Sequence, residues 1–235
     1  MINERPYLIF FNSILHKNTL SLRIGISTHK NKEQLFNKKQ IPFRDIRLFK
    51  KNNFCLKIKI FDNQNINITK IIETNNFGHI NLKIVVPINA ENINIKIYET
   101  SFHPGVEFFL GELVPELLSL DKKIIISDFD KTLVETKYSN TKEIYQSLTS
   151  PISRFPTLAE GLNKLTSHIN LGWTPFILSS SPHFYEKSIR AWMADNKLNI
   201  KNIFLKDYRQ LFSLGPTELM MKDIRHHGVH KLNQL

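Results

Sequence analysis

The stretch "IIISDFDKTLVET", residues 124–136, decides the fold of this chain. Three isoleucines run directly into Asp128, and Asp130 and Thr132 follow at two-residue spacing. A short apolar run of this kind is typical of a strand that is buried on both faces of a parallel sheet. Ligands of such sheets lie at the carboxyl ends of the strands. We therefore expect Asp128 to stand at the mouth of a crevice.

The spacing of Asp128 and Asp130 suits paired carboxylate chemistry. Residues two apart in an extended chain point the same way, so both carboxylates can face one reacting atom. One can attack while the other transfers protons. A bound Mg²⁺ would offset their mutual repulsion and would keep several of its waters. The alternative is that the pair caps a helix beginning near Lys131, because Asp is favoured at helix N-termini.

From about residue 121 onward, strands and helices alternate along the chain. The expected strands are "KKIIISD", "WTPFILSSS" and "IKNIFLKD", and the expected helices are "TLAEGLNKLTSHIN", "PHFYEKSIRAWMADNK" with Pro182 in its first turn, and "ELMMKDIRHHGVHKLNQL". This alternation predicts βαβ units around a parallel sheet.

Residues 1–120 have the sequence pattern of an all-β domain. Five segments alternate apolar and polar residues, namely "NTLSLRIGIS", "NFCLKIKIFD", "NINITKIIE", "HINLKIVVP" and "NINIKIYE". The pattern predicts a small antiparallel sandwich or barrel with one face open to water. The first helical pattern is "GELVPELLSL", residues 111–120. No tight cluster of His, Asp, Glu or Cys occurs in this half, so we expect no catalytic site there.

Two later features strengthen the interpretation of the Asp pair. "FILSSSP", residues 176–182, is another apolar run that ends in hydroxyls, and Ser179 follows the run directly. A hydroxyl at the crevice can bind a phosphoryl oxygen, whereas Ser181 before Pro182 has the ordinary position of a helix cap. Lys231, near the end of the sequence, could neutralise phosphoryl charge, although a lone helix lysine is usually a solvated residue.

Composition limits the compartment and the partners. The chain carries a net charge of +11, which favours an anionic partner, although it could serve solubility alone. The single cysteine permits no internal disulfide, and no run approaches the roughly 20 apolar residues of a membrane span. We expect a cytoplasmic protein that can lie peripherally on an anionic membrane surface.

These motifs together resemble a known group. A strand with D-F-D-K-T, a strand with S-S-S-P and a later lysine resemble the haloacid-dehalogenase (HAD) superfamily. Within it, "FPTLAEGL", "SSSPHFY", "FLKDY" and His230–Lys231 are similar to the catalytic domain of phosphatidate phosphatases, and "RPYLIFFN" with "LSLRIGIS" is similar to the β-domain preceding it. The resemblance implies an incomplete, capless α/β Rossmann-like HAD domain over 121–235, preceded by a β-sandwich-like domain over 1–120.

The resemblance also implies a role for each motif residue. Asp128 would be the nucleophile that forms an aspartyl-phosphate, and it would bind Mg²⁺. Asp130 would protonate the leaving oxygen and then activate water, and its backbone carbonyl would also bind Mg²⁺. Thr132 would steady the loop beneath the substrate. Ser179 and Lys231 would hold phosphoryl oxygens.

The sequence departs from the pattern of the family at three places. Lys131 stands where relatives often have a further Asp, and His183 stands where a Trp is usual. The third departure is the acidic motif that would complete the metal site. The sequence ends four residues after Lys231, and neither Asp207 nor Asp223 has the context of that motif. We therefore expect a C-terminally truncated member, and its activity as an enzyme is left open.

The resulting expectation is a Mg²⁺-dependent phosphatase acting on phosphatidate or a related phospholipid. The insertions after the first two motifs are too short for a cap domain, and an open crevice suits a bulky phosphomonoester. One alternative is a capless HAD phosphatase that acts on nucleic-acid ends or phosphoproteins through the same residues. Another is a catalytically dead, truncated binding module.

Overall fold

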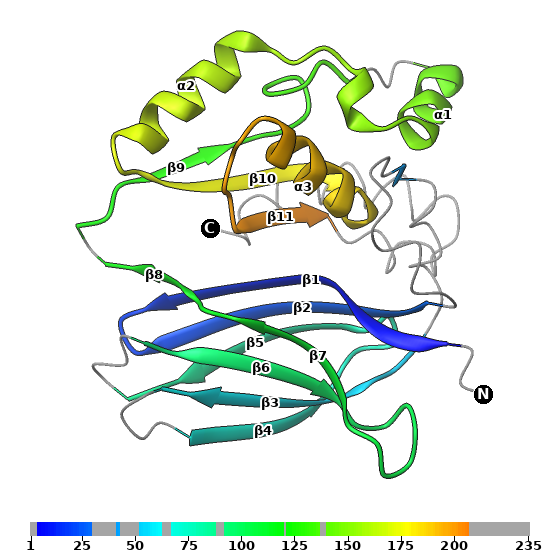
Figure 1. Cartoon of the computed structure of the whole chain (residues 1–235), viewed down its shortest axis with the longest axis vertical. Coiled ribbons are helices and arrows are strands. Elements are labelled where there is room, and N and C mark those ends of the chain that lie inside the picture. The colour runs from blue at the N-terminus through cyan, green and yellow to red at the C-terminus, as the bar shows by residue number, and fades with distance from the viewer. Residues whose placement is uncertain are drawn as a thin grey trace, which may run out of the picture. The chain divides into compact units, whose positions relative to one another are not determined.

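The structure is a computed structural model, and it describes residues 4–29, 41–42, 52–62, 67–87, 92–119, 121–136 and 140–206. The chain divides into two compact units, and the second unit contains the described residues 41–42 together with those from Lys122 onward. Strands β1 to β8 belong to the first unit (Figure 1). Strands β9 to β11 and helices α1 to α3 belong to the second.

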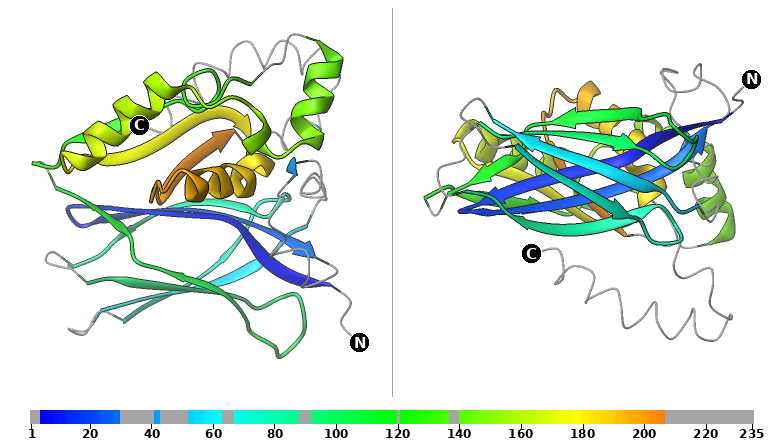
Figure 2. Two further views of the ribbon diagram at one scale, coloured as in Figure 1. Left: turned by 45° about the horizontal axis from the view of Figure 1, so that its top comes forward. Right: turned by 90° about the horizontal axis from the view of Figure 1, so that it is seen from below.

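The first unit consists of two four-stranded sheets. Its strands are β1 Arg5–His16, β2 Thr19–His29, β3 Cys55–Phe61, β4 Asn67–Glu73, β5 His79–Val85, β6 Asn94–Glu99, β7 Phe108–Leu113 and β8 Glu116–Leu118. The strand orders are β5-β2-β1-β8 and β4-β3-β6-β7. All neighbours pair antiparallel except β1 and β8, which pair parallel. The long, twisted strands of this unit can be followed in Figure 2.

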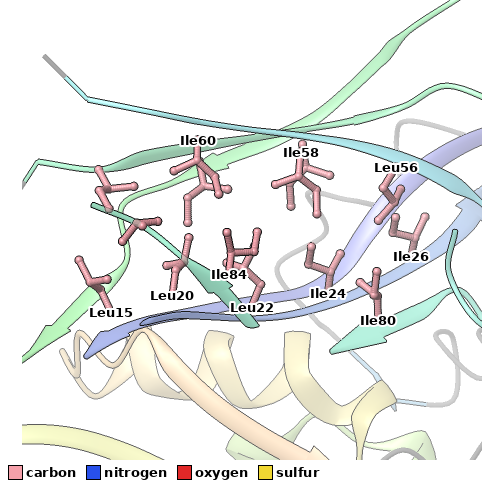
Figure 3. Close-up of a cluster of buried hydrophobic side chains, with 14 of the residues drawn as sticks. Leu15, Leu20, Leu22, Ile24, Ile26, Leu56, Ile58, Ile60, Ile80 and Ile84 are labelled. Carbon is pink, nitrogen blue, oxygen red and sulfur yellow. The ribbon is translucent and has the colours of Figure 1, made fainter. Parts of the chain in front are cut away.

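Alternation of apolar side chains builds the core of this unit. In β3 the burial pattern alternates strictly, so that Leu56, Ile58 and Ile60 are buried while their neighbours are half-buried. Figure 3 shows these side chains directed toward those of β2 and β5, such as Ile24 and Ile84. Each side chain of this size stabilises the fold by about 1.5–3 kcal/mol when it is fully buried. The period-two pattern therefore fixes which face of each strand is buried.

The five strands expected from alternation are confirmed as β2 to β6. The helical interpretation of residues 111–120 is wrong, because this segment contains the end of β7 and all of β8. Pro115 lies between the two strands and cannot donate a helical hydrogen bond. Pairing of β8 with the end of β1 supplies hydrogen bonds that a sequence pattern does not reveal.

The second unit is built on a three-stranded parallel sheet of order β11-β10-β9. Its elements are β9 Ile124–Ser127, α1 Thr141–Thr149, the 3₁₀ turn η3 Ile152–Arg154, α2 Ala159–Asn170, β10 Thr174–Pro182, the 3₁₀ turn η4 His183–Tyr185, α3 Glu186–Asp195 and β11 Asn202–Lys206. Helix α2 packs on β9 and β10. The carboxyl ends of all three strands therefore lie at one edge of the sheet.

The strand at residues 124–127 differs from the expectation of burial on both faces. Among the strands that the structure describes, β9 is at the end of the sheet and pairs only with β10. Ile124 is 40% exposed and Ile126 is 47% exposed. The prediction of burial on both faces is therefore wrong for β9, and β10 and β11 occupy the more buried positions.

The helix expected from Pro182 begins later than predicted. Pro182 is the last residue of β10, and α3 begins only at Glu186, after the turn η4. Pairing with Lys206 keeps Pro182 in the sheet. The last expected helix, residues 218–235, lies outside the described residues. Over the part of the chain that the structure describes, no helix has both the length and the apolar character needed to cross a membrane.

Candidate functional site

Asp130 is the centre of a cluster of hydroxyl groups at the carboxyl edge of the parallel sheet. It follows β9 by three residues, and it is half-buried. Ser179 Oγ, from β10, donates a hydrogen bond of 3.2 Å to Asp130 Oδ2. Ser181 Oγ donates a second hydrogen bond to the same oxygen. Two neighbouring strands therefore bring polar groups that are about 50 residues apart in sequence into direct contact.

An irregularity in β10 directs both serines toward Asp130. Leu178 pairs with Phe204 and Pro182 pairs with Lys206, so four steps along β10 correspond to two steps along β11. Extra residues in one strand bend it and redirect its side chains, a feature common beside active sites. The backbone N–H of Ser181 also donates to Ser179 Oγ at 3.2 Å. The helix-cap interpretation of Ser181 is wrong, because its hydroxyl is bonded to Asp130.

Thr136 holds the other oxygen of Asp130, and the sequence analysis missed it. Its Oγ1 donates to Asp130 Oδ1 at 2.9 Å, and the residue is only 4% exposed. Thr132, to which the resemblance gives the steadying role, is exposed. The sequence feature that could have identified Thr136 is its position. It is the first hydroxyl residue after the apolar pair Leu133–Val134, and both residues of this pair are fully buried.

The loop after Asp130 reverses the chain without forming a helix. Lys131 has a left-handed backbone (φ 59°), and its N–H donates to the carbonyl of Val134 at 2.8 Å. The N–H of Leu133 donates back to the carbonyl of Phe129 at 2.9 Å. The first helix after the motif, α1, begins at Thr141. The alternative in which the Asp pair caps a helix near Lys131 is therefore wrong.

Helices α2 and α3 fix this loop from outside. Gly161 of α2 lies so close to the loop that a Cβ atom there would be 1.9 Å from the carbonyl oxygen of Thr132. Just before α2, the N–H of Leu158 donates to the carbonyl of Leu133 at 2.9 Å. Phe129, between the two aspartates, packs edge-on against Trp192 of α3 with ring centroids 5.2 Å apart. The aspartates are thus presented on a loop that is packed on both sides.

Asp128 directly follows β9 and is half-buried. Its Oδ1 accepts a hydrogen bond of 2.7 Å from the backbone N–H of Phe129. Ser127 Oγ donates to the backbone carbonyl of Asp128 at 2.8 Å. Asp128 and Asp130 share the loop, and the bonds to Ser179 and Ser181 are made by Asp130.

A magnesium ion at this edge of the sheet would have to be bound mostly through water and substrate. No group of three or more His, Cys, Asp and Glu side chains that could hold a metal occurs within the described ranges. Mg²⁺ is commonly bound by one or two carboxylates together with substrate phosphates and waters. Both carboxylate oxygens of Asp130 accept hydroxyl donors, and Asp128 Oδ1 accepts the N–H of Phe129. The Mg²⁺ site stays a prediction.

The structure describes some of the other residues singled out from the sequence and not others. Lys231 lies outside the described residues, as do Asp207 and Asp223. His183 is fully buried and packs edge-on against Phe184. A cation that the sequence analysis did not single out, Lys206, is buried at the carboxyl end of β11. The sequence feature that could have identified Lys206 is its position directly after the apolar run "IFL".

Comparison of the chain with protein-family models, with curated proteins and with solved structures finds no match. The resemblance to the HAD superfamily therefore rests on the motif residues alone.

Proposed function

We propose that this chain is a Mg²⁺-dependent phosphatase of the HAD type, which acts through an aspartyl-phosphate on phosphatidate or a related phospholipid. One observation carries the proposal. Asp130 is held by three hydroxyls at the carboxyl edge of a parallel sheet, two residues after Asp128 on the same packed loop. The arrangement supports Asp128 as the attacking carboxylate and Asp130 as the group that moves a proton, because paired carboxylates at a strand end can divide these two roles.

The proposed reaction has two displacement steps. In the first, Asp130 begins in its protonated form; a carboxylate oxygen of Asp128 forms a bond to phosphorus while the bond to the leaving oxygen breaks, and Asp130 gives that oxygen its proton. In the second, water attacks the phosphorus, Asp130 takes a proton from the water, and the bond from phosphorus to Asp128 breaks. Inorganic phosphate leaves, and both carboxyl groups return to their initial states. Bound Mg²⁺ would supply neutralisation of phosphoryl charge.

The hydroxyl contacts favour a changed role for Ser179. Ser179 is buried and donates its hydrogen bond to Asp130, so we assign it to positioning the proton-transfer group. Ser181 and Thr136 also position Asp130, Ser181 through the same carboxylate oxygen and Thr136 through the other one. Three donors on one carboxylate restrict its rotation, and proton transfer requires the carboxylate to stay within hydrogen-bond reach of the leaving oxygen.

The phospholipid substrate is supported by charge and by the resemblance. The net charge of +11 favours an anionic leaflet, which attracts basic residues near its surface by about 1 kcal/mol each. Nucleic-acid ends and phosphoproteins would need the same reacting residues. The substrate class must therefore be decided by direct competition between phosphomonoesters.

The test is phosphate release by the full 235-residue chain from short-chain phosphatidate, with Mg²⁺ and with a chelator. We expect Mg²⁺-dependent release that Asp128→Asn abolishes. Asp195→Asn, which makes the same change at an exposed position of α3, should leave the rate unchanged. A phosphorylated peptide spanning Asp128, detected by mass spectrometry after an acid quench, should accompany turnover.

Three outcomes would change the proposal. Full activity of Asp128→Asn would exclude the aspartyl-phosphate. Faster release from a 5′-phosphorylated oligonucleotide or a phosphopeptide would replace the phospholipid as substrate. Mg²⁺-dependent phosphate binding without any turnover would instead support the binding module.

A further inference from the structure

The face of the sheet β4-β3-β6-β7 that is turned away from the core carries lysines and aromatic rings that the mechanism above does not use. Side chains alternate along a strand, so the residues between the buried ones project to this face. They include Lys57, Lys59 and Phe61 of β3 and Lys96 and Tyr98 of β6, all of them half-buried. We call these five residues the lysine–aromatic face. They belong to the first unit, whereas the aspartate cluster belongs to the second.

Two lysines of this face lie directly opposite each other. Lys59 of β3 is the register partner of Lys96 of β6. Like charges at directly opposed positions of an antiparallel pair destabilise a sheet. Lys57 is two residues from Lys59 and adds a third positive charge on the same face. An anion held between these ammonium groups would relieve their repulsion, so the arrangement favours an anionic ligand.

The acidic partners of these lysines lie at the β7 side of the face. Lys57 Nζ is 2.7 Å from Glu107 Oε1, and Lys96 Nζ is 3.6 Å from Glu112 Oε2. The side chains of the two glutamates are 47% and 41% exposed. Exposed pairs of this kind contribute little to stability, so an anionic ligand can replace the glutamates. Among the described residues Lys59 has no ion pair, so its charge is available to a ligand.

Aromatic rings flank the opposed lysines on both sides. Lys59 Nζ lies 5.3 Å from the ring centroid of Tyr98, and Lys96 Nζ lies 4.9 Å from that of Phe61. Phe109 of β7 is 57% exposed, and its ring centroid is 5.5 Å from that of Tyr98. Rings and cations therefore alternate across three neighbouring strands.

This alternation distinguishes between anionic partners. Single-stranded nucleic acid offers a planar base to each ring and a phosphate to each lysine, and sheets that bind it commonly stack bases on aromatic side chains. An anionic membrane would meet the lysines, but it offers no planar group to half-buried rings.

We propose that the lysine–aromatic face binds single-stranded nucleic acid, with bases stacked on Tyr98 and Phe61 and phosphates held by Lys59 and Lys96. On binding, each ammonium group turns from its ring to a phosphate, and a base takes its place over the ring. This interaction surface lies in the first unit and does not depend on the proposed phosphatase activity.

The test is fluorescence anisotropy of a labelled oligouridylate of about 12 nucleotides, titrated with the full chain at several salt concentrations. The oligonucleotide carries no terminal phosphate, so it offers no phosphomonoester to the aspartate cluster. Binding is therefore measured independently of phosphate release. We expect an affinity that falls as salt rises, because binding of lysines to phosphates releases counterions.

Substitutions examine the two halves of the contact separately. Lys59→Gln combined with Lys96→Gln should make the slope of log affinity against log salt shallower by about 1.4, since each phosphate contact to a single strand contributes roughly 0.7. Tyr98→Leu should weaken binding roughly 5–150-fold through loss of one stacked base. Lys70→Gln and Tyr145→Leu are the matched controls and should bind as the parent chain does. Lys70 projects from the opposite face of the same sheet, and Tyr145 is exposed on α1.

The outcomes separate this proposal from the phosphatase. A parent chain that binds no oligouridylate overturns it, and so does a salt slope that the two lysine substitutions leave unchanged. If Tyr98→Leu does not fold, the slope alone decides, because both lysines lie outside the core. Lysine-dependent retention on vesicles of phosphatidylserine and phosphatidylcholine, without binding of oligouridylate, would assign the face to a membrane and overturn the proposal. Binding of oligouridylate by a chain that releases no phosphate from phosphatidate would support it while the phosphatase proposal fails.

Discussion

At the scale of single residues, the site depends on what holds Asp130. Thr136 bonds one carboxylate oxygen, and Ser179 and Ser181 bond the other. A carboxylate held from both sides has little freedom to rotate away from the substrate. Loss of one donor leaves a partly buried oxygen without that partner, which typically costs about 1–3 kcal/mol.

Thr136→Val tests this restraint with a side chain of nearly the same shape. We expect the free energy of unfolding, measured by urea denaturation, to fall by about 1–2 kcal/mol, because a buried hydrogen bond to a carboxylate is lost. Phosphate release should slow, because Asp130 is less well oriented for proton transfer. Thr149→Val, at a half-buried position of α1, removes a hydroxyl whose hydrogen bond is to the carbonyl of Tyr145 in its own helix, and it is the matched control. Equal effects of the two variants would contradict the role of Thr136.

At the scale of elements, close packing of α2 positions the loop that carries the aspartates. Gly161 has no side chain, and the carbonyl of Thr132 occupies the space that a Cβ atom would need. Glycine within a helix normally costs about 1 kcal/mol relative to alanine. The close contact with the loop explains why a glycine is present at this position of the helix.

Gly161→Ala should therefore destabilise the protein despite the better helix propensity of alanine. The new methyl group meets backbone, which cannot rotate aside, and overpacking of this kind costs roughly 1–3 kcal/mol. The loop should shift and phosphate release should fall more than stability alone predicts. Asn163→Ala, an exposed position of the same helix, should stabilise slightly through propensity alone. A melting temperature that rises for Gly161→Ala as well would refute the close contact.

At the scale of the whole molecule, the chain consists of two compact units. The described core of the first unit is a cluster made by its own strands, among them β2, β3, β5 and β6. The aspartates, the serines and Lys206 all belong to the second unit. Folding of one unit and ligand binding by the other should therefore respond to different substitutions.

Ile58→Ala in the full chain tests this separation. Ile58 is fully buried in β3, and a large-to-small change at such a site costs about 2–5 kcal/mol. We expect the unfolding transition of the first unit to move to lower urea while orthophosphate affinity stays unchanged. Ile71→Ala, at a residue of β4 that is 68% exposed, should change neither quantity. Loss of orthophosphate binding by folded Ile58→Ala would show that the site depends on both units.

The sequence by itself determined the local elements of this protein. Period-two alternation located β2 to β6, because a strand with one buried face has an apolar residue at every second position. Apolar runs located β9, β10 and β11, and their polar ends marked the edge at which Asp130 and Ser179 meet. These features depend on residues that are close together in the chain, so a local sequence pattern is enough to predict them.

Only the tertiary structure decided which side chains contact one another. The register shift between Leu178 and Pro182 turns Ser181 toward Asp130, and no local pattern records the register of two strands. The exposure of Ile126 follows from the end position of β9 among the described strands, and the burial of Lys206 from its place beside β10. Pairing partners are chosen by contacts between residues distant in sequence, so the periodicity of a single segment does not specify them.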